Sequence, residues 1–274
     1  MSTRTRTTAS TPASTPTPAA GFSGRRVLGL ARFNLTLMLR NRTTLVYGLV
    51  MPLLPLLLLL TTSGDSDRGV ATTVTSAWLV ALLFPVYYNL LSMFVTRRDE
   101  LVLKRLRTGE VRDLELIVSM ALPGAAIGIV GALLAVPAVA LSGGSMPTNA
   151  LLLVVGLLAA VGTFAALAIW TASWTRTAEA AQLTSAPVMV LALVGTVVGV
   201  VPDSVARWLE LTPGAAVADV VSVAWFGLES GQEEGTLSWG ATFTEGALPI
   251  VVLLAWTVLA VVVARRSLRW EPRS

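Results

Sequence analysis

The sequence predicts an all-α polytopic membrane protein with six transmembrane helices and with both termini in the cytoplasm. Of its 274 residues, 54% are hydrophobic and only 13% are charged, whereas soluble globular domains carry about 25% charged residues. The charged residues also avoid six apolar stretches of 18 to 26 residues, which hold at most one acid or base between them. These stretches are 45–62, 72–95, 116–141, 150–172, 183–201 and 247–264.

The length of each stretch fits a helix that crosses a bilayer. About 20 residues, at a rise of 1.5 Å per residue, cover the hydrocarbon layer of roughly 30 Å. Helices are expected because they satisfy their own peptide groups, which lipid cannot do. The stretches do not alternate polar and apolar residues, as the strands of a membrane barrel do.

The connecting segments predict the orientation of the spans. The first 44 residues hold seven arginines and no acid, 96–115 holds six basic residues, and the tail 265–274 holds four. On the other side, 63–71 and 202–246 hold one basic residue each. Because basic residues concentrate on the cytoplasmic side, both termini are expected there. This topology accounts for the basic composition without a nucleic-acid partner.

The N-terminal region divides into a tail and a helix. Residues 1–24 are rich in Ser, Thr, Pro and Ala and predict a disordered cytoplasmic tail. Residues 25–42 predict an amphipathic helix whose apolar side is interrupted by Asn34. Such a helix lies in the membrane surface with its arginines toward the headgroups, or it packs on a soluble partner. The arginines of this expected interfacial helix are Arg25, Arg32, Arg40 and Arg42.

Prolines and glycines mark particular positions within the spans. Pro52 and Pro55 interrupt the first span, where each removes a helical hydrogen bond and bends the helix. Two pairs of glycines four residues apart predict close contacts between helices, or they reflect the abundance of small residues in these spans. The pairs are Gly124 with Gly128 and Gly195 with Gly199.

The connection between the second and third spans is the most densely charged segment. Arg97 and Lys104 are seven residues apart, as are Arg98 and Arg105, so a helix there would carry all four on one face. Gly109 would end this helix. The pattern favours equally a helix that docks a soluble partner and a solvated loop that follows the charge rule.

The long connection 202–246 predicts a helix too short to span. Thr212 and Pro213 have the types expected for the cap and the first turn of a helix. A helix over 213–226 would be about 21 Å long, so it either dips into the outer leaflet or lies on it. Asp219 lies off its apolar stripe, and an acidic, exposed loop follows. The stripe contains Val217, Val220, Val221, Ala224 and Trp225.

The composition excludes several kinds of chemistry. The chain contains no cysteine and no histidine, so disulfides, the usual zinc and haem ligands and histidine acid–base catalysis are excluded. Lys104 is the only lysine and follows Leu103, whereas a phosphate-binding P-loop needs Gly-Lys followed by Ser or Thr. We therefore expect no catalytic, metal or cofactor site in this chain.

In their order and spacing, these features resemble the permease subunit of an ABC-2 type ABC transporter. The interfacial helix ends in Leu-Arg-Asn-Arg at 39–42, before the proline-containing first span. The run Leu-Lys-Arg-Leu-Arg at 103–107 is similar to the family pattern after the second span, although Gly109 and Glu110 stand where many members have proline. Leu-Thr-Pro at 211–213 precedes an Ala-Asp pair and a tryptophan, and six spans complete the likeness.

The resemblance implies a function and two sites. Two permease subunits, identical or different, would work with two soluble ATPase subunits that bind ATP and Mg²⁺, in a bacterial cytoplasmic membrane. They would export a hydrophobic or amphipathic compound such as a drug, an antibiotic or a lipid. The ATPase-coupling residues would be Arg97, Arg98, Leu101, Lys104, Arg105, Leu106, Arg107, Thr108, Gly109 and Glu110. The outer gate or re-entrant element would contain Thr212, Pro213, Val217, Val220, Val221 and Trp225.

Two other functions are consistent with the sequence. A non-transporting membrane scaffold would recruit a cytoplasmic protein, without any ATP turnover that a substrate stimulates. An ion-coupled carrier would follow a proton or sodium gradient without an ATPase. Such carriers usually keep a carboxylate at membrane depth, and none lies at the centre of a predicted span.

Overall fold

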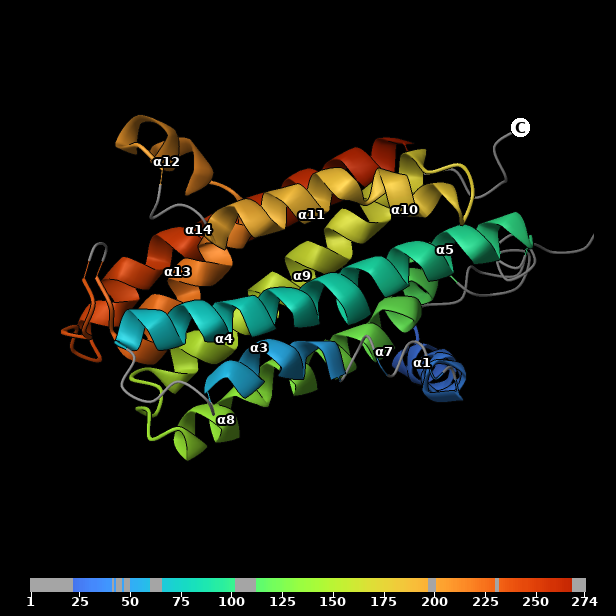
Figure 1. Ribbon diagram of the computed structural model, residues 1–274. Helices are drawn as coiled ribbons and strands as arrows, with labels where there is room; N and C mark the ends of the chain where they lie inside the picture. The colour runs from blue at the N-terminus through green and yellow to red at the C-terminus, as the bar shows by residue number, and fades with distance from the viewer. Residues whose placement is uncertain are drawn as a thin grey trace, which may run out of the picture.

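The protein is an elongated bundle of helices (Figure 1). The computed structural model describes residues 22–40, 42, 46, 50–59, 66–101, 112–196, 201–229 and 232–267. Within these ranges every regular element is helical, which confirms the all-α prediction. The predicted tail 1–24 lies almost entirely outside the described residues.

Four helical segments among the described residues are long and apolar enough to cross a membrane. The first, 33 residues long, joins α4 (Asp67–Ala81), η2 (Leu82–Tyr88) and α5 (Asn89–Asp99). The other three have 29, 25 and 27 residues. They are α7 (Asp113–Leu133) with α8 (Ala135–Leu141), α9 (Ala150–Trp174) and α14 (Ala241–Ser267).

The other two predicted spans are shorter in the described part of the chain. At 45–62 the described helix is α3 (Met51–Leu59), with Pro55 inside it. At 183–201 the helical stretch runs through α10 (Ala180–Thr184) and α11 (Ala186–Leu193) to Thr196, 17 residues in all. Both fall short of the roughly 20 residues that a bilayer requires, so the described helices alone do not give six spans.

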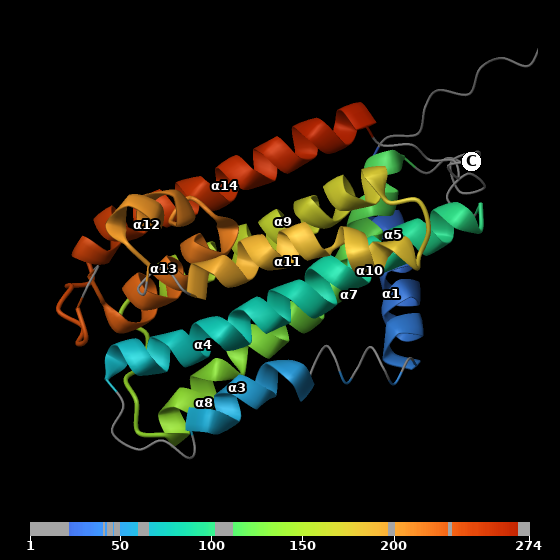
Figure 2. The same cartoon turned by 45° about the horizontal axis from the view of Figure 1, so that its top comes forward.

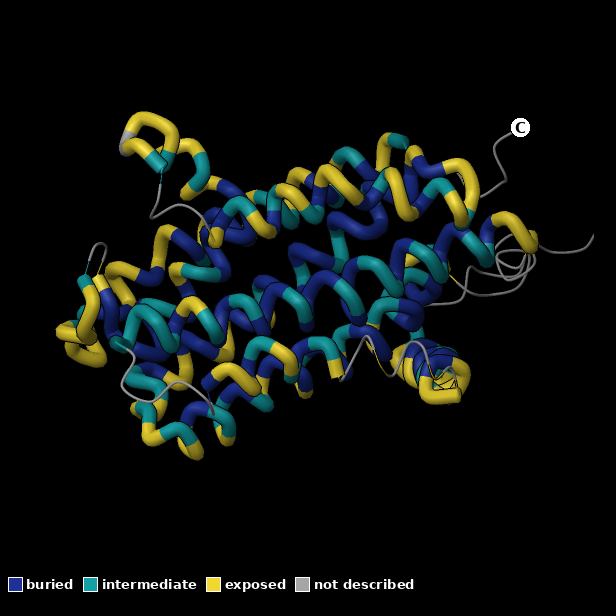
Figure 3. Tube along the Cα trace, in the orientation of Figure 1, coloured by how far each residue is buried: buried dark blue, intermediate teal, exposed yellow. Residues whose placement is uncertain are grey.

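The charged residues separate to the two ends of the bundle. The basic end, defined here by Arg98, Arg112, Arg176 and Arg265, is where α5, α9 and α14 stop and α7 begins. The acidic end, defined by Glu229, Glu233 and Glu234, is where α4 and α9 begin. Between the ends, dark blue buried segments run through the middle of the bundle (Figure 3). The largest apolar side chains that are fully buried there are Trp78, Tyr87, Phe94, Phe164 and Trp225.

Glycine allows two helices to approach closely at η2, the π-helical turn within the first long segment. Pro85 cannot donate an amide hydrogen bond, and the wider π turn absorbs it within a continuous helix. A Cβ on Gly124 of α7 would overlap the Pro85 carbonyl oxygen, and one on Gly128 would press on Val86 and Ala81. The predicted contact of this glycine pair is therefore confirmed.

The second predicted glycine pair is described only in part. Gly195 lies directly against the backbone of Gly214 and Ala215, so a Cβ would not fit there. Its companion, Gly199, lies outside the described residues.

We predict that Gly124→Ala destabilises the protein, because the added methyl group displaces α7 from η2. Overpacking of this kind costs about 1–3 kcal/mol. Thermal unfolding in detergent measures the effect. Gly162→Ala on α9 is the matched control, because a Cβ at Gly162 meets no atom within 4 Å and alanine favours a helix. Equal shifts in Tm for the two variants would contradict the close contact.

Candidate functional site

A short helix lies across the basic end of the bundle (Figure 2). This helix, α1 (Gly24–Arg40), buries one narrow stripe consisting of Val27, Ala31, Asn34 and Met38. The stripe packs on α7. The amphipathic helix predicted over 25–42 is confirmed as far as Arg40, where α1 ends, and residue 41 lies outside the described ones.

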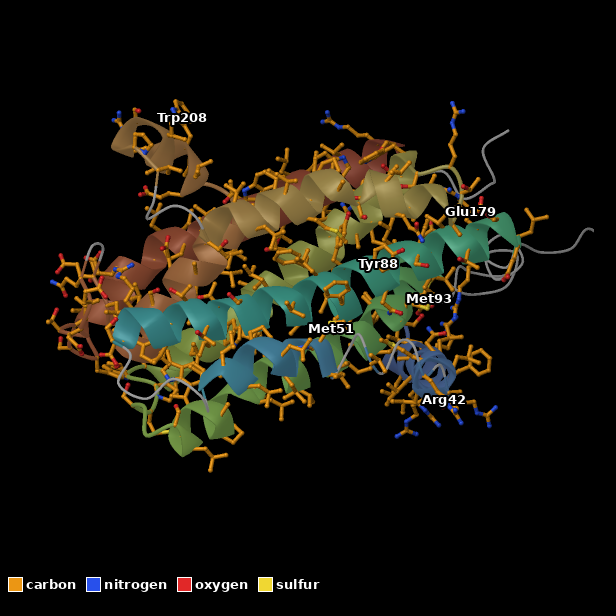
Figure 4. The ribbon with its side chains drawn as sticks, in the orientation of Figure 1. Arg42, Met51, Tyr88, Met93, Glu179 and Trp208 are labelled. Atoms are coloured by element: carbon orange, nitrogen blue, oxygen red, sulfur yellow. The ribbon has the colours of Figure 1, made fainter. Side chains whose placement is uncertain are left out.

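The exposed side of α1 mixes arginines with large apolar residues. Arg25, Arg32, Arg40 and Arg42 are all exposed, and Figure 4 shows Arg42 beside α1, away from the bundle core. Leu28, Phe33, Leu37 and Leu39 are also exposed, although the sequence predicted a cleaner division into two sides. A mixture of arginine, phenylalanine and leucine is typical of helices that lie in the headgroup region.

Asn34, the polar exception in the apolar stripe, connects α1 to two other helices. Its side-chain nitrogen donates to the Ser119 carbonyl of α7 at 2.9 Å. Its side-chain oxygen accepts from the Arg97 guanidinium of α5 at 2.6 Å. Both bonds lie at a buried or half-buried position, where a missing partner would cost free energy. Asn34 therefore joins α1, α5 and α7 at one point.

Glu115 holds the start of α1 against the start of α7. Its carboxylate is completely buried and accepts the backbone amides of Ser23 at 2.6 Å and Arg112 at 3.1 Å. The Arg26 guanidinium lies 3.9 Å away. A buried carboxylate requires such donors. In the sequence, Glu115 belongs to the charged connection 96–115 and was not predicted as a site residue, although an acid in the first turn of an apolar helix is a recognisable capping signal.

Arg98 is completely buried and turns toward α9. Its guanidinium donates to the carbonyls of Ala172 at 3.0 Å, Thr175 at 2.6 Å and Arg176 at 3.1 Å. These carbonyls are at the end of α9 and just beyond it, where helical acceptors lack backbone partners and a cation is favoured. Arg98 was expected on an exposed coupling face. That placement is wrong, because the side chain caps α9 inside the bundle.

The helix that carries Arg97 and Arg98 does not continue into the predicted coupling helix. The Glu100 amide still bonds to the Thr96 carbonyl, but Leu101 has a left-handed backbone with φ of 59°. This conformation ends a helix. The expectation that Arg97 and Arg98 share a face with Lys104 and Arg105 on one helix is therefore wrong. The remaining predicted coupling residues, Lys104, Arg105, Leu106, Arg107, Thr108, Gly109 and Glu110, lie outside the described residues.

The predicted short helix near the acidic end has the expected bounds. It is α13 (Pro213–Phe226), and the Thr212 side chain caps it by accepting the Ala215 amide at 3.3 Å. Gly227, with φ of 64°, ends it. Before it comes α12 (Asp203–Leu209), which stands apart from the bundle with Trp208 75% exposed (Figure 4).

α13 is an internal part of the bundle. It contacts α4, α9 and α14, and the residues predicted for the outer gate are all buried: Thr212, Pro213, Val217, Val220, Val221 and Trp225. The alternative of a helix lying on the surface is therefore wrong, because three helices cover it. Its end is tied to the start of α9 by the Thr148 and Asn149 amides, which donate to Trp225 and Ala224 at 2.8 Å.

The acidic loop after α13 is fixed to the start of α4. The Asp67 carboxylate accepts the Gly235 amide at 3.0 Å, and Arg68 donates to the Gln232 carbonyl at 2.5 Å. Arg68 also lies 3.9 Å from the Glu233 carboxylate. The loop is exposed, as predicted from the sequence, and it joins α13 to α4 across the acidic end.

A model of the family described as ABC-2 type transporter matches residues 25–214. The chain belongs to this family. The matched region includes α1, the three long helices from α4 to α9, and α11. It stops at the start of α13, so most of α13 and all of α14 lie beyond the match. A search of curated proteins finds no match.

Within this ABC-2 transporter chain, Asn34→Ala should loosen α1. The substitution removes two hydrogen bonds, one of them from a charged donor, and such bonds contribute about 1.5–3 kcal/mol. We expect a lower Tm and faster trypsin cleavage at Arg25 and Arg32. Thr36→Ala is the control, because Thr36 is exposed and bonds only to its own helix. If trypsin cleaves both variants at the wild-type rate, Asn34 does not hold α1.

We also predict that Arg98→Lys is not a conservative substitution. The guanidinium reaches three carbonyls at once, which one lysine ammonium cannot reproduce from the same position. Carbonyls left without donors cost about 1–3 kcal/mol each, so the Tm should fall. Arg266→Lys at the exposed end of α14 should leave the Tm unchanged. An unchanged Tm for Arg98→Lys would contradict the capping role.

Proposed function

We propose that this chain is the permease subunit of an ATP-driven exporter. The observation that carries the proposal is the family match over residues 25–214. The exporter would contain a second permease subunit and separate soluble ATPase subunits, which bind ATP and Mg²⁺. Its spans offer mostly apolar and weakly polar side chains, which suit a hydrophobic or amphipathic substrate such as a drug, an antibiotic or a lipid.

The proposal includes six spans in a bacterial cytoplasmic membrane, with the basic end inside. The four long helices would be four of the spans, and the sequence stretches 45–62 and 183–201 would be the other two. The concentration of arginine at one end supports this orientation. The arginines and apolar side chains of α1 would lie among the inner headgroups.

Coupling to the ATPase would enter through the segment 102–110, directly after α5. The last turn of α5 is tied to α1 through Arg97 and to α9 through Arg98. A displacement of this turn would therefore move both neighbours. The free energy would come from the different affinities of the ATPase for ATP in its open and closed states. α13, which ends among α4, α9 and α14, would close the outer side.

We expect the double variant Arg105→Glu, Leu106→Ser to lose both ATPase binding and transport, because it reverses a charge and removes an apolar side chain from the proposed coupling segment. The measurements are co-purification of the ATPase in mild detergent and ATP-dependent uptake of substrate into inverted vesicles. Arg266→Glu, a charge reversal at the same end of the bundle, is the control and should preserve both.

The outcomes separate the three candidate functions. If the double variant binds the ATPase and transports as wild type does, the coupling assignment fails. A wild-type complex whose ATP turnover never responds to substrate would indicate a membrane scaffold. Uptake driven by a proton or sodium gradient in vesicles without the ATPase would indicate an ion-coupled carrier and would overturn the proposed function.

A further inference from the structure

Asp219 differs from every other residue of α13. All fourteen residues of this helix are described, and Asp219 is the only exposed one. Ser222, three residues later on the same face, is half-buried. The rest of the helix fills the space between α4, α9 and α14. α13 therefore presents a narrow polar edge to the outside of the single chain.

This polar edge lies at membrane depth. Val220, the neighbour of Asp219, packs against Gly156 of α9, where a Cβ would overlap a Val220 methyl group. Gly156 is six residues into α9, about 9 Å below its outer end by helical rise. At the other end of α13, the Leu211 carbonyl accepts from Trp256, near the middle of α14. Asp219 is thus alongside the length of two long apolar helices.

The charges near Asp219 leave its carboxylate available. Glu210 and Arg68 are the charged groups that act on it electrostatically. Arg68 binds the carbonyls of Gln232 and Glu229 and pairs with Glu233. Within the described part of the chain, Asp219 itself makes no hydrogen bond or ion pair. The one cation that acts on Asp219 is therefore already engaged with the acidic loop, and Glu210 adds negative charge to its surroundings.

α4, which packs against α13, also carries a polar face. Arg68, Thr72 and Ser76 recur every four residues and therefore share one face of the helix. Thr72 is exposed and Ser76 is half-buried. Both hydroxyl groups donate to carbonyls of their own helix, which leaves their oxygens as acceptors. Accessible acceptors thus occur on both α4 and α13 in the outer half of the bundle.

A carboxylate at this depth is unfavourable against lipid chains, and such residues mark substrate pathways when they face water or a bound group. We infer that Asp219 lines the transport pathway and binds the positive charge of a cationic amphipathic substrate, such as a lipophilic amine. Charge complementarity supports this assignment, since α4 and α13 offer accessible acceptors and Glu210 adds to the negative charge that acts on Asp219. The inference rests on the proposed function and narrows its substrate class.

The test uses the complete transporter with its ATPase, reconstituted in inverted vesicles. ATP-dependent uptake is measured for ethidium, a cationic amphipath, and for Nile red, an uncharged one. Asp219→Asn keeps the side-chain shape and removes the charge, so ethidium uptake should fall at least tenfold relative to Nile red uptake. Asp219→Glu keeps the negative charge, so it should retain part of the wild-type preference for ethidium over Nile red. Glu234→Gln, which removes a charge from the exposed acidic loop, should leave both rates unchanged.

Each other outcome has a definite meaning. If the wild-type transporter takes up Nile red but not ethidium, the inference fails while the proposed function stands. The same holds if Asp219→Asn keeps the wild-type ratio of ethidium uptake to Nile red uptake. An equal loss of both probes, with a lower Tm or altered association of the permease subunits, would show a structural role and would also overturn it. If wild type transports neither probe under ATP and its ATPase responds to neither, the proposed function itself fails.

Discussion

The constraint on which this structure depends is that a charge may enter the bundle only where the chain itself satisfies it. Glu115 is fully buried because two backbone amides and an arginine meet it. Arg98 is fully buried because three carbonyls at the end of α9 meet it. Asp219 has no such partners among the described residues and stays at the surface of its helix. The same rule therefore separates structural charges from one that is available to a ligand.

The satisfied charges also determine how the helices are connected. Neighbouring arginines on α5 reach in different directions, Arg97 to α1 and Arg98 to α9. Two neighbouring side chains of α5 thus connect this helix to α1 and to α9. Because these hydrogen bonds lie in the last turn of α5, a force applied to that turn would reach α1 and α9 as well. This arrangement gives the proposed coupling a physical route through particular hydrogen bonds.

Close backbone contacts play the corresponding role within the apolar interior. Lipid tails are as apolar as leucine, so helices in a membrane associate through packing and internal hydrogen bonds. Gly124 meets the π turn at Pro85, and Gly195 meets the start of α13. The short helix α13 is held in this way although it cannot span the bilayer. Its Thr212 cap, its glycine terminus and its contacts with three long helices place its one exposed carboxylate at a defined depth.

The sequence by itself determined the class of the protein, because the absence of charge from long stretches leaves helices in lipid as the only solution. It also determined the bounds of α13 and the amphipathic nature of α1, since caps and periodicity are local properties. Only the tertiary structure decided the partners of Asn34, Arg98 and Glu115 and the exposure of Asp219. Those contacts join residues 63 to 92 positions apart, and no local pattern encodes which distant carbonyl or amide a side chain will meet.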